Sequence, residues 1–65
     1  MKFKDTLKQL RNDNNLSQKD LADALGTTAK TVSHWETGYT EPSIAQIVAI
    51  ARYFEISIDE LLGNQ

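Results

Sequence analysis

The side chains best suited to contact a partner lie together near the middle of this 65-residue sequence. A helix there brings positions i, i+1, i+4 and i+5 to one side, because an α-helix has 3.6 residues per turn. Ala29, Lys30, Ser33 and His34 occupy those positions. An ammonium group, a hydroxyl and an imidazole can hydrogen-bond to a polar surface, and the alanine methyl adds an apolar contact. The pattern indicates binding, with a solvated and unpartnered imidazole as the alternative for His34.

No set of residues typical of an active site accompanies this face. The sequence has one histidine and no cysteine, which leaves no histidine pair and no thiolate metal site. It also lacks a glycine-rich phosphate loop and a G-x-S-x-G motif. Asp59 and Glu60 fall in the first turn of a predicted helix, where carboxylates stabilise the helix end. We therefore expect no enzyme, no metal site and no cofactor.

Apolar residues repeat with helical spacing, and the capping residues between them predict five short helices and no strand. The first helix runs from Phe3 to Asp13–Asn14. Ser17, Thr28, Ser43 and Ser57 are the expected N-caps of the other four. Asp20 is expected at the N3 position after Ser17, and capping boxes are expected at Ser43–Gln46 and Ser57–Glu60. Gly26 and Gly38 are expected to end the second and third helices, and the fifth is expected to end near Leu62.

The expected core draws on each helix. Val32 and Trp35 form the inward face of the third helix, which favours a buried Trp35 over a stacking platform. In the fourth helix the helical period selects Ile44, Ile47, Ile50, Ala51 and Phe54 as the inward face, and it leaves Val48 and Tyr53 off that face. The prediction is a compact all-α, five-helix single domain over residues 1–65.

Charge is unevenly distributed along the chain. The formal net charge of −2 divides into +2 for residues 1–35 and −4 for residues 36–65. A polyanionic partner would therefore face the first half. The first ten residues have no apolar signal-peptide region, and no apolar run is long enough to span a bilayer, so we expect a cytoplasmic protein without membrane contact.

The stretch from residue 16 to residue 38 carries a specific pattern. It reads Gln18-x-x-Leu21-Ala22-x-x-x-Gly26, then Val32-Ser33-x-Trp35-Glu36-x-Gly38. Ala22 lets the second and third helices cross closely, Gly26 makes the turn between them, and Val32 holds the third helix to the core. This pattern resembles the helix-turn-helix domains of the Cro and phage-repressor type, the XRE-like family. The resemblance covers essentially the whole chain, and it places the helix-turn-helix unit at about residues 17–37.

What the resemblance implies is sequence-specific binding of double-stranded DNA by a transcription regulator. The third helix would lie in the major groove, and the protein would act as a homodimer on a pseudo-palindromic operator. The implied base-reading residues are Ala29, Lys30, Ser33 and His34. The implied phosphate-binding residues are Ser17, Gln18, Thr28, Thr37, Tyr39 and Thr40.

The resemblance also implies a largely buried ion pair between Arg11 and Glu36, with two solvated surface charges as the alternative. The expected dimer surface comprises Ile56, Ile58 and Leu62. Two departures from the family predict modest affinity for DNA per subunit. Ala29 stands where a longer polar side chain would discriminate between bases more sharply. The loop after the third helix has Thr40–Glu41 where many relatives have basic residues. A protein-interaction module of the same fold, with a protein partner, is the alternative function, and the acidic second half favours it.

Overall fold

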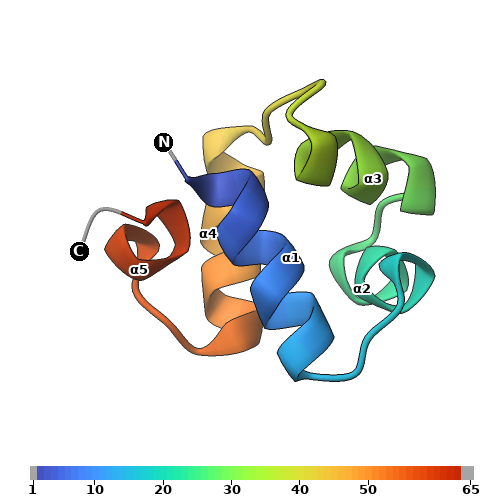
Figure 1. Ribbon diagram of the computed structural model, residues 1–65. Helices are drawn as coiled ribbons and strands as arrows, with labels where there is room; N and C mark the ends of the chain where they lie inside the picture. Colours follow the sequence, from blue (N-terminus) through green and yellow to red (C-terminus); the bar gives the residue numbers. More distant parts are fainter. Residues whose placement is uncertain (1, 64–65) are drawn as a thin grey trace.

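The computed structural model describes residues 2–63, and these form five helices joined by short connections (Figure 1). No strand is present among these residues, so the prediction of an all-α domain is confirmed. The helices are α1 (Phe3–Asp13), α2 (Gln18–Leu25), α3 (Ala29–Thr37), α4 (Ile44–Phe54) and α5 (Ile58–Leu62).

Helices α2 to α5 each begin at a serine or threonine whose side-chain oxygen accepts a hydrogen bond from a backbone N–H in the first turn. These bonds satisfy amides that have no partner within the helix. Complete capping boxes are present at Ser17–Asp20 and Ser43–Gln46. The box predicted at Ser57–Glu60 is only half formed. Glu60 N donates to Ser57 Oγ at 3.0 Å, but the Glu60 carboxylate faces the Ser57 hydroxyl at 3.4 Å instead of the backbone N–H.

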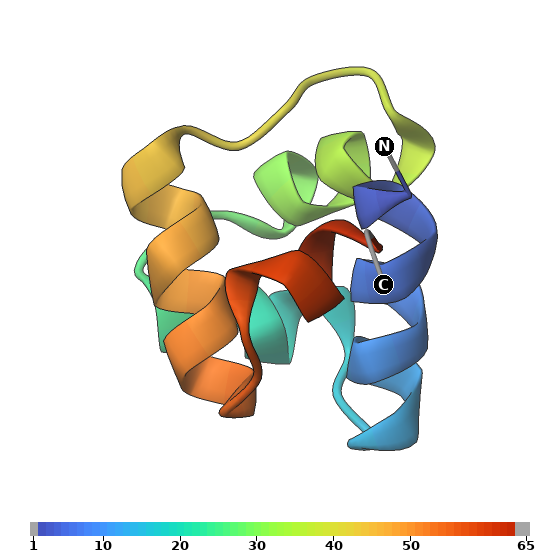
Figure 2. The same cartoon turned by 90° about the vertical axis from the view of Figure 1, so that its left-hand side faces the viewer.

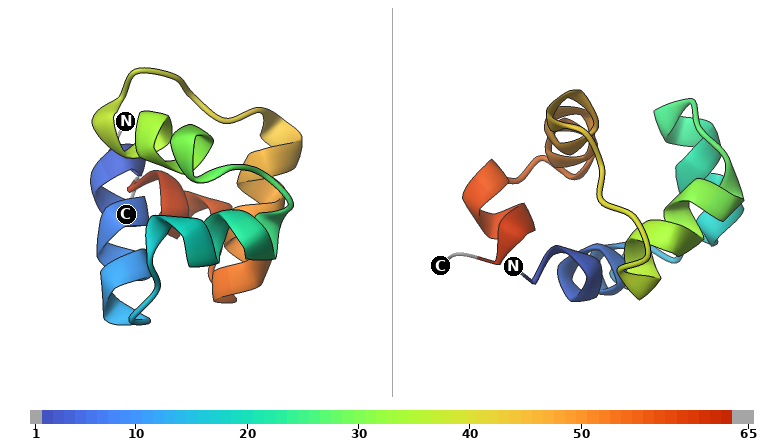
Figure 3. Two further views of the ribbon diagram at one scale, coloured as in Figure 1. Left: turned by 90° about the vertical axis from the view of Figure 1, so that its right-hand side faces the viewer. Right: turned by 90° about the horizontal axis from the view of Figure 1, so that it is seen from above.

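One hydrophobic core joins all five helices. Figure 2 shows α5 between α1 and α4, and Figure 3 shows α2 and α3 together on the side of the molecule opposite α5. Apolar side chains that are at most 3% exposed fill the space between them: Phe3, Leu7, Leu21, Ala22, Val32, Trp35, Ile50, Ala51 and Leu61. The α2–α3 pair is therefore supported from behind by the other helices.

The prediction for the inward face of α4 was wrong at one position. Ile44 is 81% exposed, whereas Ile50 and Ala51 are buried and Ile47 and Phe54 pack partly against the core. Ile44 is the first residue of α4, directly after its N-cap, where the chain has only just left the loop. The helical period was therefore correct, but the core does not extend to that end of the helix.

The two ends of the described chain lie together, because Lys2 N donates to Leu62 O at 3.3 Å. None of the helices within residues 2–63 combines the length and apolar character that crossing a bilayer requires.

Candidate nucleic-acid interface

Helix α3 is shaped by a cap at each end and by two buried side chains. Thr28 has extended backbone angles, and its Oγ1 accepts from Thr31 N at 3.2 Å. At the other end Gly38 adopts φ +81, in the left-handed region that favours glycine. Val32 and Trp35 are 0% and 2% exposed and attach the inner side of α3 to the core. The opposite side of the helix is left for contact with a partner.

The four predicted base-reading residues lie on α3 but differ in accessibility. Lys30 is exposed, whereas Ala29, Ser33 and His34 are half-buried. The His34 ring lies against the Tyr39 ring, with centroids 4.7 Å apart and planes inclined at 60°. Tyr39 therefore restricts the orientation of the imidazole, and Lys30 has the longest free reach on this face.

An ion pair of low exposure connects α1 to α3. Arg11 Nε donates to Glu36 Oε2 at 2.7 Å, and Arg11 Nη2 donates to Glu36 Oε1 at 3.0 Å. The two side chains are 12% and 4% exposed. Arg11 Nη1 also donates to Leu16 O at 2.8 Å. The hydrogen bond and charge of Glu36 raise the pKa of Arg11 above its ordinary value, while burial opposes this rise.

Gln18 joins this network from the start of α2. Its Nε2 donates to Glu36 Oε1 at 3.2 Å, so the carboxylate receives bonds from both α1 and α2. The family resemblance implied a phosphate contact for Gln18 and did not indicate this bond. One amide hydrogen of Gln18 is committed to Glu36, and the other remains for an anion. The ion pair and this bond together hold α1, α2 and the last turn of α3 in fixed positions.

The other predicted phosphate-binding residues are exposed and lie at the ends of α2 and α3 or in the loop after α3. Ser17 and Thr28 are exposed N-caps, with hydroxyl oxygens that already accept from backbone amides at 2.9 and 3.2 Å. Thr37, Tyr39 and Thr40 are exposed at the end of α3 and in the loop that follows it, and Thr37 Oγ1 donates to His34 O at 3.2 Å. The start of α2 and the end of α3 are close in space because Gln18 reaches Glu36.

The three residues predicted for a dimer surface do not form one exposed patch. Ile56 and Leu62 are half-buried and pack against the core, whereas Ile58 is 43% exposed. Within residues 2–63, no group of three or more His, Cys, Asp or Glu side chains is arranged to hold a metal ion.

Residues 7–61 match the sequence model of a protein family described as Helix-turn-helix. The chain belongs to this family, in its Cro and phage-repressor branch. The matched region extends from the middle of α1 to α5 and contains the whole α2–α3 unit, so the helix-turn-helix pattern in the sequence was interpreted correctly.

Two curated relatives and one solved structure are similar to the chain. The HTH-type transcriptional activator BcrR of Enterococcus faecalis is 37% identical over 100% of this chain and 32% of its own length. The cryptic phage CTXphi transcriptional repressor RstR of Vibrio cholerae is 38% identical over 98% of this chain and 57% of its own. The crystal structure of a transcriptional regulator from Listeria innocua superposes with a TM-score of 0.89 at 34% identity, covering 94% of this chain and 57% of that one. The chain thus spans about a third to just over half the length of these three relatives.

Proposed function

We propose that this helix-turn-helix domain binds double-stranded DNA sequence-specifically, with α3 in the major groove. The observation that carries the proposal is the fixed presentation of α3. Its inner side is buried through Val32 and Trp35, and its last turn is tied to α1 and α2 through Glu36. A helix that the core already holds in place loses little conformational entropy when it binds, so its docking costs less free energy. Its outer side then offers Lys30 to guanine O6 or N7, and Ala29 to a thymine methyl.

The base contacts would be completed by Ser33 and by His34, whose imidazole orientation Tyr39 supports. Phosphate contacts would come from two places that flank α3. Gln18 offers its backbone amide at the positive end of the α2 dipole. Ser17 offers its hydroxyl, because its own amide already donates to Asp20 Oδ2. Thr28 flanks the start of α3, and the hydroxyls of Thr37, Tyr39 and Thr40 flank its end.

The domain would bind as a homodimer. One protomer measures 28 × 23 × 20 Å, so two side by side can place their α3 helices about 34 Å apart, one turn of DNA. Of the three residues predicted for the dimer surface, Ile58 offers the largest exposed apolar area for such a contact. The proposal includes both activation and repression of transcription, since one relative is named an activator and another a repressor. It also places the protein in the cytoplasm, where the DNA of bacteria and phages is read.

A titration of labelled duplex against salt tests DNA binding directly. The logarithm of the binding constant should fall linearly with the logarithm of salt concentration, by about 0.9 for each phosphate neutralised. Absence of binding below micromolar concentration at low salt, for genomic and for selected duplexes, would refute the proposal.

A protein-interaction module is the second candidate function. Residues 37–65 carry a net charge of −3 on exposed side chains, and α4 exposes Ile44 at 81% and Tyr53 at 44%. An acidic surface with exposed apolar side chains suits a basic protein partner better than DNA. In that case the salt titration would detect no duplex binding, and a protein would protect α4 from hydrogen exchange.

A further inference from the structure

Lys4, in the first turn of α1, lies against the loop that follows α3. A Cβ atom placed on Gly38 would be 3.4 Å from Lys4 Cδ and 3.7 Å from Lys4 Nζ. The lysine stem therefore passes over the loop at a residue that has no side chain of its own. Its ammonium group ends beside the backbone of Gly38, between the exposed Thr37 and Tyr39 in the sequence.

The loop itself provides no positive charge. The last residue of α3 and the loop after it, residues 37–41, contain no lysine or arginine, and Glu41 is negative. The hydroxyls of Tyr39 and Thr40 are the polar groups that this segment offers to an anion. Thr37 Oγ1 and the backbone amides of residues 38–40 already donate to carbonyl groups of α3. A phosphate approaching this loop would therefore find hydrogen-bond donors but no compensating cation from the loop.

The ammonium group of Lys4 is available to an anion. The ion pairs found within residues 2–63 are Arg11–Glu36 and Lys19–Asp23, and neither involves Lys4. A hollow of about 150 Å³ opens beside it, lined by Phe3, Lys4, Trp35, Gly38, Thr40 and Glu41. No ion pair within the described residues holds the Lys4 ammonium group, so its flexible stem can turn the charge toward a ligand at the loop.

We propose that Lys4 is a phosphate-contacting residue of the DNA interface, supplying from α1 the charge that the loop after α3 lacks. The inference rests on the proposed function and adds a contact that the helix-turn-helix unit alone does not contain. The competing explanation is structural: an ammonium group at the C-terminal end of α3 also compensates the negative end of the helix dipole. That role would change the stability of the fold and leave the salt dependence of DNA binding as it is.

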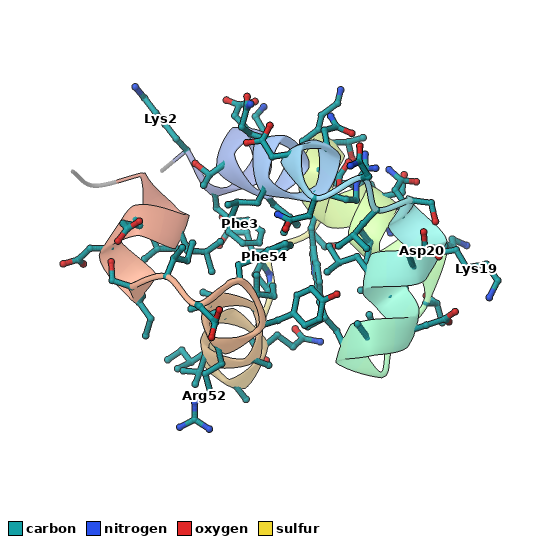
Figure 4. All side chains as sticks on the ribbon, turned by 90° about the horizontal axis from the view of Figure 1, so that it is seen from below. Lys2, Phe3, Lys19, Asp20, Arg52 and Phe54 are labelled. Atoms are coloured by element: carbon teal, nitrogen blue, oxygen red, sulfur yellow. The ribbon has the colours of Figure 1, made fainter. Side chains whose placement is uncertain are left out.

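The test compares Lys4→Gln and Lys4→Arg with two controls, Lys2→Gln and Arg52→Gln, in salt titrations of a duplex that the parent chain binds. Figure 4 shows the side chains of Lys2 and Arg52 directed outward, well apart from each other. Lys2 lies next to Gly63, and Arg52 is on α4, so each control removes one positive charge away from the loop.

Lys4→Gln should reduce the magnitude of the log–log salt slope by about 0.9 per bound protomer. It should weaken binding by the same factor for every sequence, because a phosphate contact reads no base. Lys4→Arg should keep the parent slope, as should both controls. An unchanged slope for Lys4→Gln, or an equal loss in Lys2→Gln, would overturn the inference while leaving the proposed function intact. If the parent chain binds no duplex, the proposed function fails first.

Discussion

Arg11 and Glu36 are 25 residues apart in the sequence and form a two-point ion pair, with N–O distances of 2.7 and 3.0 Å. Because Arg11 also binds Leu16 O and Gln18 also binds Glu36, one carboxylate orients three segments. The pair fixes the last turn of α3 relative to α1. The angle at which α3 would enter a groove thus depends on two residues that need not touch the DNA.

Replacing Arg11 with alanine should lower the free energy of unfolding by about 3–5 kcal/mol, because the Glu36 carboxylate would remain buried without its counter-charge. Urea titration with Trp35 fluorescence measures this loss. Lys19→Ala is the matched control, since Lys19 and Asp23 form a pair whose side chains are 76% and 65% exposed. That control should cost no more than about 1 kcal/mol. A loss below about 1 kcal/mol for Arg11→Ala would contradict the structural role of the pair.

The cap of α2 predicts a pH dependence of stability. Hydrogen bonds from the backbone N–H and hydroxyl of Ser17 lower the pKa of Asp20 below its ordinary value of 3.8. A folded-state pKa below the unfolded one stabilises the fold above the unfolded pKa, and this contribution is lost as the pH falls through the folded value. As the pH falls from 5 through the folded-state pKa of Asp20, the free energy of unfolding should therefore decrease less for Asp20→Asn than for the parent. Urea titrations at several pH values measure this difference. Parallel stability curves for the two proteins would refute this assignment.

Lys30 is expected to provide the strongest base contact. Lys30→Ala should reduce discrimination at one guanine by about 1–3 kcal/mol. The measurement compares affinities for single-base variants of a selected duplex. Arg52→Ala, at an exposed residue on α4, removes one positive charge away from α3 and should keep the base preference. A uniform loss across all base variants would assign Lys30 to phosphate contact instead.

The dimer surface can be tested at Ile58. Ile58→Asp should shift the protein toward monomer in sedimentation equilibrium and should remove the advantage of a duplex with two half-sites over one. Ile44→Asp changes a still more exposed isoleucine on α4 and should leave both properties unchanged. If Ile44→Asp dissociates the protein and Ile58→Asp does not, the dimer surface is at the start of α4.

Features that depend on a few consecutive residues could be predicted from the sequence. Ser17 caps α2 as predicted, and Ser43 with Gln46 sits at the spacing of a capping box and forms one. Gly26 and Gly38 take the left-handed conformation that ends a helix. The burial of Trp35 followed from its place on the same face as Val32. These results are local, because a helical turn sets which side chains can meet.

Features that depend on the packing of separate helices could not be predicted from the residues alone. The exposure of Ile44 depends on where the core ends, and the bond between Gln18 and Glu36 depends on how α2 crosses α3. The position of Lys4 over Gly38 joins the first turn of α1, which precedes the helix-turn-helix unit, to the residue that ends α3. A hydrophobic period contains no information about these contacts.

The central claim is that α3 reads DNA sequence, and selection of bound duplexes from a random pool tests it most directly. The claim predicts an enriched sequence with two related half-sites whose centres are about 10–10.5 base pairs apart, or a multiple of that distance. Repeating the selection with Lys30→Ala should enrich a site with relaxed preference at one position in each half-site. A pool that stays random through the selection, at low salt and with folded protein, would contradict the claim.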